Sequence, residues 1–207
     1  RSTEKATSSS PRRPAAKGAG APTPFARPPE PSSARGPLVA RPEESQLTVD
    51  VAELKQVLAQ RVSGVAIVTA RAGDRIHGMT VSAFAEVSLV PPLVLVCAEK
   101  CSHTHPVIAS GGVFALNLLA ADQRELSNRF ASKRDEDRRF VGLDYESGVT
   151  GAPLLSGTLA TLDCRVRAAH DAGDHVIYVG EVVDLRRSQR EPLVYWAGTY
   201  RTLGSID

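Results

Sequence analysis

The segment "CAEKCSHTHP" (97–106) concentrates two cysteines and two histidines in ten residues, directly after an apolar run. In an extended chain Cys101, His103 and His105 would share one side, as the ligands of a zinc or iron ion do. The opposite alternation carries the groups that a phosphate-binding loop offers, namely Lys100, Ser102 and Thr104. Residue spacing alone leaves both the metal and the phosphate interpretation open.

The segment "HGMTVSAFAEVS" (77–88) reads as a strand with unusually small side chains. The small positions are Gly78, Thr80, Ser82, Ala83 and Ser88. Such a strand packs weakly, but it lets a flat ligand approach backbone N–H and C=O groups. The same residues also fit the outer face of an ordinary sheet, and composition alone favours that second interpretation.

The segment "NRFASKRDEDRRF" (128–140) is a run of charges that is typical of a solvated helix face. Its acidic residues 135–137 lie among the arginines and argue against a nucleic-acid-binding stripe.

His175, in "GDH", stands where a strand begins, a position at which a histidine is usually an ordinary polar residue. The sequence contains no G-x-G-x-x-G, P-loop, H-E-x-x-H or nucleophile-elbow motif, so the commonest enzyme signatures are absent.

Composition divides the 207-residue chain into two parts. Residues 1–47 hold nine of the fourteen prolines and one of the ten aromatic residues, so we expect a disordered tail followed by one domain over 48–207. The tail has eight Lys/Arg against four Asp/Glu, which leaves seventeen against nineteen for the domain.

No apolar stretch approaches the roughly 20 residues of a membrane span. Three cysteines do not form a disulfide framework, and we expect a cytoplasmic protein with reduced thiols.

The pattern of the domain predicts a mainly β fold. Val51, Leu54, Val57 and Leu58 recur at helical spacing after an Asp50 cap, and this predicts a helix that Gly64 ends. Strands are predicted at 65–70, 78–89, 92–98, 113–120, 158–170 and 175–187, with a short helix in "HPVIASGG" and a charged helix in 121–140. Strands and helices do not alternate regularly, which disfavours a parallel sheet and favours an antiparallel barrel.

The segments "GVAIVTA", "HGMTVSAFAEVSLVPPLVLVCAEKCSHTHPVI", "FALNLLAADQRELSNRFAS" and "GDHVIYVGEV", in this order, resemble the flavin reductase family, which has the FMN-binding split-barrel fold. The resemblance runs from about Val51 to Leu203. It implies that the isoalloxazine ring of the flavin lies against Met79, Thr80, Val81, Ser82, Ala83 and Ser88. It implies that the ribityl phosphate lies against Glu99, Lys100, Ser102 and Thr104, with Arg129 and Phe130 also near the flavin or the nicotinamide nucleotide.

The resemblance also implies an activity. NADH or NADPH would reduce FMN or FAD, with His175 beside the nicotinamide as the candidate catalytic residue and no metal required. The family implies a homodimer that passes reduced flavin to a separate monooxygenase, without a nucleic-acid or membrane partner. Two alternatives remain: a split barrel that retains FMN as a prosthetic group, and a non-enzymatic metal-binding or interaction module built on residues 97–105.

Overall fold

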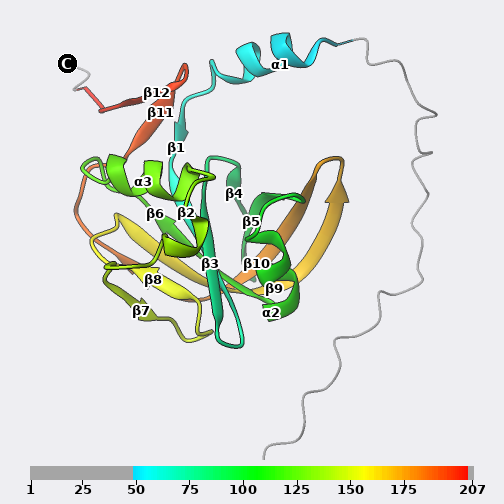
Figure 1. The fold of residues 1–207 in the computed structure, drawn as a ribbon, viewed down its shortest axis with the longest axis vertical. Helices are drawn as coiled ribbons and strands as arrows, with labels where there is room; N and C mark the ends of the chain where they lie inside the picture. Colours follow the sequence, from blue (N-terminus) through cyan, green and yellow to red (C-terminus); the bar gives the residue numbers. More distant parts are fainter. Residues whose placement is uncertain (1–48, 205–207) are drawn as a thin grey trace, which may run out of the picture. The chain divides into compact units, whose positions relative to one another are not determined.

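The structure is a computed structural model that describes residues 49–204 (Figure 1). The tail predicted at 1–47 therefore lies outside the described residues. Within 49–204 no helix is long and apolar enough to cross a membrane.

The described chain is built around a seven-stranded sheet in which all neighbouring strands are antiparallel. Its spatial order is β3-β2-β6-β9-β10-β5-β4. The strands are β2 (Ala66–Ala72), β3 (Arg75–Val81), β4 (Phe84–Leu89), β5 (Pro92–Glu99), β6 (Val113–Leu118), β9 (Ala160–Ala172) and β10 (His175–Arg187). The mainly β, antiparallel split-barrel prediction is confirmed.

The two edge strands of this sheet, β3 and β4, are consecutive in the chain. Only Ser82 and Ala83 separate them, so the first and last strands of the sheet must meet at this point. Each edge strand is hydrogen-bonded on its other side, β3 to β2 and β4 to β5. The sheet therefore curls into a barrel with a split between its edges, and the single strand predicted over 78–89 is two strands.

Smaller elements surround the barrel. A second sheet joins β1 (Ser63–Gly64), β11 (Val194–Trp196) and β12 (Thr199–Arg201), and β7 (Tyr145–Ser147) pairs with β8 (Pro153–Leu155). The helices are α1 (Val51–Leu58), α2 (His105–Gly111) and α3 (Arg124–Ala131), with a 3-10 helix η1 (Glu136–Arg138). The charged helix predicted over 121–140 thus ends early, because the chain after Ala131 turns back toward the barrel.

Strand β2 is buried on both faces, which explains its continuous apolar sequence. Val68 contributes to the barrel core with Phe114 and Leu116. On the other face Ile67 packs in a cluster with Phe130 from α3. Burial of each such side chain contributes roughly 1.5–3 kcal/mol. The helix that carries Phe130 is thereby fixed against the barrel.

Helix α1 begins as the sequence predicts but ends earlier. The Asp50 carboxylate accepts a hydrogen bond from the Glu53 amide at 2.9 Å, and the helix ends before Ala59 rather than at Gly64. Its apolar residues are exposed: Leu54 by 44% and Val57 by 63%. No residue of α1 is buried in the described chain, so this face lacks a partner within it.

Helix α2 lies against β2, and a glycine permits the close contact. A β-carbon at Gly111 would overlap the Arg71 carbonyl oxygen and lie 2.9 Å from its carbonyl carbon. Both are backbone atoms of β2, which cannot rotate away as a side chain can. Gly111 therefore sets the position of α2 and of the loop that precedes it.

We predict that Gly111→Ala lowers the free energy of unfolding by about 1–3 kcal/mol, because the methyl group overpacks this contact. Thermal denaturation followed by circular dichroism measures the change. The control is Gly204→Ala, whose β-carbon would meet no neighbouring atom. A Gly111→Ala protein that melts at the same temperature as this control contradicts the assignment.

Candidate functional site

A cavity of about 450 Å³ opens at the split of the barrel. This volume lies within the range of roughly 300–1,000 Å³ that is usual for small-molecule sites. Four parts of the chain form its wall: the β3–β4 junction, the end of β5 with the following loop, the segment from α3 to η1, and the start of β10. The lining residues are Met79, Thr80, Val81, Ser82, Ala83, Cys97, Glu99, Cys101, Ser102, His103, Thr104, Phe130, Ala131, Lys133, Glu136, Arg139 and His175.

The first wall is the β3–β4 junction. Ser82 and Ala83 are exposed, and the Ala83 carbonyl accepts a hydrogen bond from the Cys97 amide at 2.9 Å. The Thr80 hydroxyl donates to the Ser127 carbonyl of α3 at 2.7 Å. Since the side chains here are small, the wall presents backbone and short polar groups, as a planar ligand requires.

The second wall is the loop between β5 and α2, which is a turn rather than an extended chain. The Ser102 amide and hydroxyl both donate to the Glu99 carbonyl, at 3.0 and 2.8 Å. The alternation expected from the sequence is therefore broken, and residues from both predicted sets face the cavity. Among them are Cys101 and His103, whereas His105 bonds to the Tyr178 hydroxyl at 2.7 Å through Nδ1.

Lys100 lies outside the cavity wall. Its Nζ donates to Asp171 Oδ1 at 2.7 Å and to the Gly173 carbonyl at 2.6 Å. The amine therefore joins the end of β5 to the turn between β9 and β10. The phosphate role predicted for Lys100 receives no support from this position.

The third wall comes from the charged segment after α3. Phe130 is fully buried, with its ring 5.3 Å from that of Phe140 in a T-shaped arrangement, and this contact brings the intervening residues back over the barrel. Lys133 thereby reaches the cavity. Arg129 does not: it donates to the carbonyls of Arg138 and Val141, beside a separate hollow. The prediction of a solvated helix face missed this wall.

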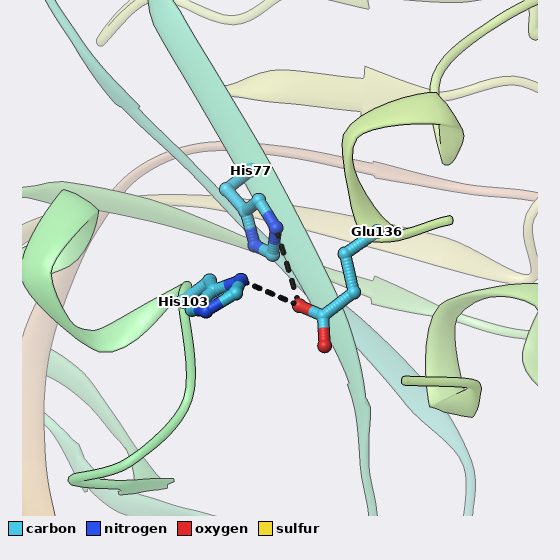
Figure 2. Close-up of side chains that lie close together, drawn as sticks. All are labelled: His77, His103 and Glu136. Carbon is cyan, nitrogen blue, oxygen red and sulfur yellow. Dashed lines mark ion pairs between the residues drawn. The ribbon is translucent and has the colours of Figure 1, made fainter. Parts of the chain in front are cut away.

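His77 and Arg139 are both buried beside the third wall, and Figure 2 shows His77 directed at Glu136 of that wall. His77 Nδ1 lies 2.8 Å from the Thr104 hydroxyl, and its Nε2 lies 3.5 Å from Glu136 Oε2. Burial, and then the positive charge of Arg139, lower the pKa of His77 to about 4, so the ring is neutral at neutral pH. Arg139 itself donates to the carbonyls of Gly78, at 2.7 Å, and Ser132.

His175 is the first residue of β10 and pairs with Glu99 of β5. Its Nδ1 lies 2.7 Å from the Asp174 carboxylate, and the hydrogen bond from His175 lowers the pKa of Asp174. Because an ionised carboxylate only accepts hydrogen bonds, Nδ1 carries the proton and Nε2 is left for a ligand. The side chain is about one-third exposed and lines the cavity.

The structure brings most of the predicted site residues into this one cavity. The exceptions are Ser88, Lys100 and Arg129, since Ser88 lies further along β4, opposite Leu93. The cavity also contains residues that the sequence did not assign to a flavin or nicotinamide site: Cys97, Cys101, His103, Ala131, Lys133, Glu136 and Arg139. The sequence offers one signal for the third wall, namely Phe140, an apolar residue at the end of the charge run. Such a residue indicates that the run returns to the core rather than remaining in solvent.

The cavity suits a planar ligand with an anionic end. One wall is backbone and small side chains, and the segment after α3 contributes Lys133, together with Arg139 and its partner Glu136. A flavin has this form, with a flat ring system and a phosphate. The residues present therefore fit a flavin nucleotide.

These features define a split barrel with a nucleotide-sized cavity at its seam. The chain belongs to the flavin reductase like domain family, to which residues 59–204 match. It is 43% identical over 146 residues to the FMN reductase (NADH) SmoA of Agrobacterium fabrum, covering 70% of this chain and 82% of SmoA. The resemblance identified from the sequence is thereby confirmed.

Two further relatives extend the comparison. The reductase subunit HsaB of a flavin-dependent monooxygenase from Rhodococcus jostii is 38% identical over 153 residues, which cover 73% of this chain and 77% of HsaB. The NADH:FAD oxidoreductase SgcE6 of Streptomyces globisporus, solved in complex with NAD and FAD fragments, is 34% identical with a TM-score of 0.70. That match covers 75% of this chain and 93% of SgcE6.

We predict that Lys133→Ala weakens flavin binding by about 1–3 kcal/mol, roughly five- to 150-fold in Kd, because it removes a cation from the cavity. Lys100→Ala is the matched control and should change Kd by less than about threefold, since its amine is held by Asp171. Quenching of flavin fluorescence measures both values. A larger loss for Lys100→Ala than for Lys133→Ala would restore the phosphate role to Lys100.

Proposed function

We propose that the protein is an NADH-dependent flavin reductase that reduces FMN or FAD and releases the reduced flavin to a separate monooxygenase. The observation that carries this proposal is the cavity at the barrel split, whose lining combines a small-residue wall with the side chain of Lys133. The names of the relatives SmoA, HsaB and SgcE6 support the cofactors and the partner.

The roles of the residues follow from their places in the wall. Residues 79–83 bind the flavin ring, and Glu99, Ser102 and Thr104 with Lys133 surround the ribityl phosphate end. When bound, the flavin and the nicotinamide together supply the hydride transfer. The protein has to orient the two rings and exclude water, so a catalytic triad is not needed.

His175 positions the nicotinamide in this proposal. Its Nδ1 is fixed by Asp174, which leaves Nε2 for the ligand, as a hydrogen-bond acceptor when the ring is neutral. The carboxamide group of the nicotinamide offers a matching N–H donor.

The three cysteines are all free, which suits the reducing cytoplasm expected from the sequence.

A homodimer completes the proposal. The exposed apolar residues Val51, Leu54, Val57 and Leu58 form one face of α1 that the described chain leaves uncovered. An exposed apolar helix face of this kind is typical of a protein–protein interface. A second copy of the chain is the simplest partner for it.

The activity is tested by mixing the pure protein with NADH or NADPH and with FMN or FAD, and by following nicotinamide absorbance. We expect multiple turnovers of added free flavin and faster oxidation of NADH than of NADPH. A protein that keeps stoichiometric flavin through gel filtration and does not turn over free flavin would instead be a flavoprotein with a prosthetic group. Absence of nicotinamide oxidation under all four conditions would refute the proposal.

We predict that His175→Ala lowers kcat/KM for NADH about tenfold to a thousandfold, equivalent to roughly 1.4–4 kcal/mol, while the Kd of the flavin stays within a few-fold. Asp174→Asn should give a smaller loss, because the ring keeps Nε2 but loses its anionic partner. Steady-state kinetics at saturating flavin, beside direct flavin binding, separates the two effects. Loss of flavin binding with unchanged NADH kinetics would assign His175 to the flavin.

We predict that Leu54→Glu dissociates the dimer, because it places a charge in the apolar face of α1. Sedimentation velocity should show about twice the 22.0 kDa chain mass for the wild type and the chain mass for the variant. Lys55→Glu, on the same helix but outside that face, should remain dimeric. A monomeric wild type, or equal behaviour of the two variants, rules out α1 as the interface.

A further inference from the structure

We propose that His77, His103 and Glu136 form a binding site for a divalent transition-metal ion of the zinc type, in the wall of the cavity. Figure 2 shows the three side chains converging from β3, from the loop before α2 and from η1. Within the described residues this is the one group of three such ligands whose donor atoms lie within 4.8 Å of one another. The site goes beyond the proposed reductase function, which needs no metal.

Two of the three donor–donor distances in the cluster match those around a tetrahedral metal, and the third is within 4.8 Å. Glu136 Oε2 lies 3.2 Å from His103 Nδ1 and 3.5 Å from His77 Nε2. With zinc–ligand bonds of about 2.0–2.1 Å, the edges of a tetrahedron are about 3.3–3.4 Å. Side-chain rotation that brings the two histidine nitrogens to the same separation would let the three atoms hold one ion.

His77 provides independent support for a ligand at this place. The residue is 4% exposed, yet its Nε2 is buried without a hydrogen-bond partner in the described chain. An orphan nitrogen of this kind costs roughly 1–3 kcal/mol unless something binds it. Its other nitrogen, Nδ1, is 2.8 Å from the Thr104 hydroxyl, the type of outer partner that orients a metal-binding histidine.

The neighbouring Arg139 limits the affinity without blocking the site. Its Nη1 lies 3.4 Å from the same Glu136 oxygen, so its charge opposes a cation. The guanidinium nevertheless keeps its hydrogen bonds to the carbonyls of Gly78 and Ser132 when Glu136 turns to a metal. We therefore expect weaker binding than at a structural zinc site, with the fourth coordination position open to water or another ligand.

This site differs from the metal site suggested by the residue pattern at 97–105. Only His103 belongs to both sets. His105 bonds to Tyr178, and the Cys101 sulfur lies 3.5 Å from a Glu99 oxygen. His77 and Glu136 are distant from this segment in sequence, so spacing could not reveal them.

The test is a titration of the flavin-free, chelator-treated full chain with Co²⁺, followed by visible absorption. We expect one equivalent of cobalt with the d–d bands of a low-coordinate ion, no thiolate-to-cobalt charge-transfer band, and loss of the signal on addition of Zn²⁺. His103→Ala and Glu136→Gln should each weaken cobalt binding at least tenfold to a hundredfold, since even outer partners contribute that much. The control His170→Ala, an exposed histidine on β9, should bind cobalt as the wild type does.

Circular dichroism verifies that each variant is folded, which is expected because the His103 side chain is 64% exposed. Absence of cobalt binding overturns the proposal. So does a signal that survives both His103→Ala and Glu136→Gln, or one that carries a thiolate band and disappears in Cys101→Ser. Because no flavin or NADH is present, the outcome is independent of whether the protein is a reductase.

Discussion

The two-residue connection between β3 and β4 is the constraint on which the rest of the structure depends. These strands are the opposite edges of the seven-stranded sheet, and Ser82 with Ala83 joins them directly. The sheet must therefore curl until its edges meet, yet β3 and β4 are not paired with each other. The split that results is the cavity, and the chain that closes the barrel is also the wall expected to bind the flavin ring. Fold and site are consequences of the same short junction.

Strands and their order along the chain could be predicted from sequence, whereas the closure of the sheet could not. Alternating and β-branched residues identify β9 and β10, and the apolar run of β2 follows from burial on both faces. The break between β3 and β4 was missed because Ser82 and Ala83 carry no proline or glycine signal. The exposed apolar face of α1 was also unexpected, since helical periodicity predicts an apolar face without indicating what covers it.

In the site, too, residues within one segment could be predicted from the sequence, whereas those placed by contacts between distant segments could not. The resemblance to flavin reductases pointed to residues 79–83 and His175, and all of them line the cavity, while their roles toward flavin and nicotinamide stay predictions. Lys100 was expected on the same wall from its alternation with Ser102 and Thr104 and from the resemblance. Its amine instead bonds to Asp171, 71 residues away in the sequence, outside the cavity wall. Lys133 was missed because a charge run reads as a solvated helix, and it reaches the cavity only through the packing of Phe140 on Phe130.

We expect four separate segments to enclose one flavin at the barrel split. Hydrogen–deuterium exchange with and without FMN, resolved by peptide, measures this enclosure. FMN should slow exchange together in residues 79–83, 99–104 and 130–139 and at the start of β10, with little change in β7 and β8. Protection confined to another surface, or to one of these segments alone, would contradict it.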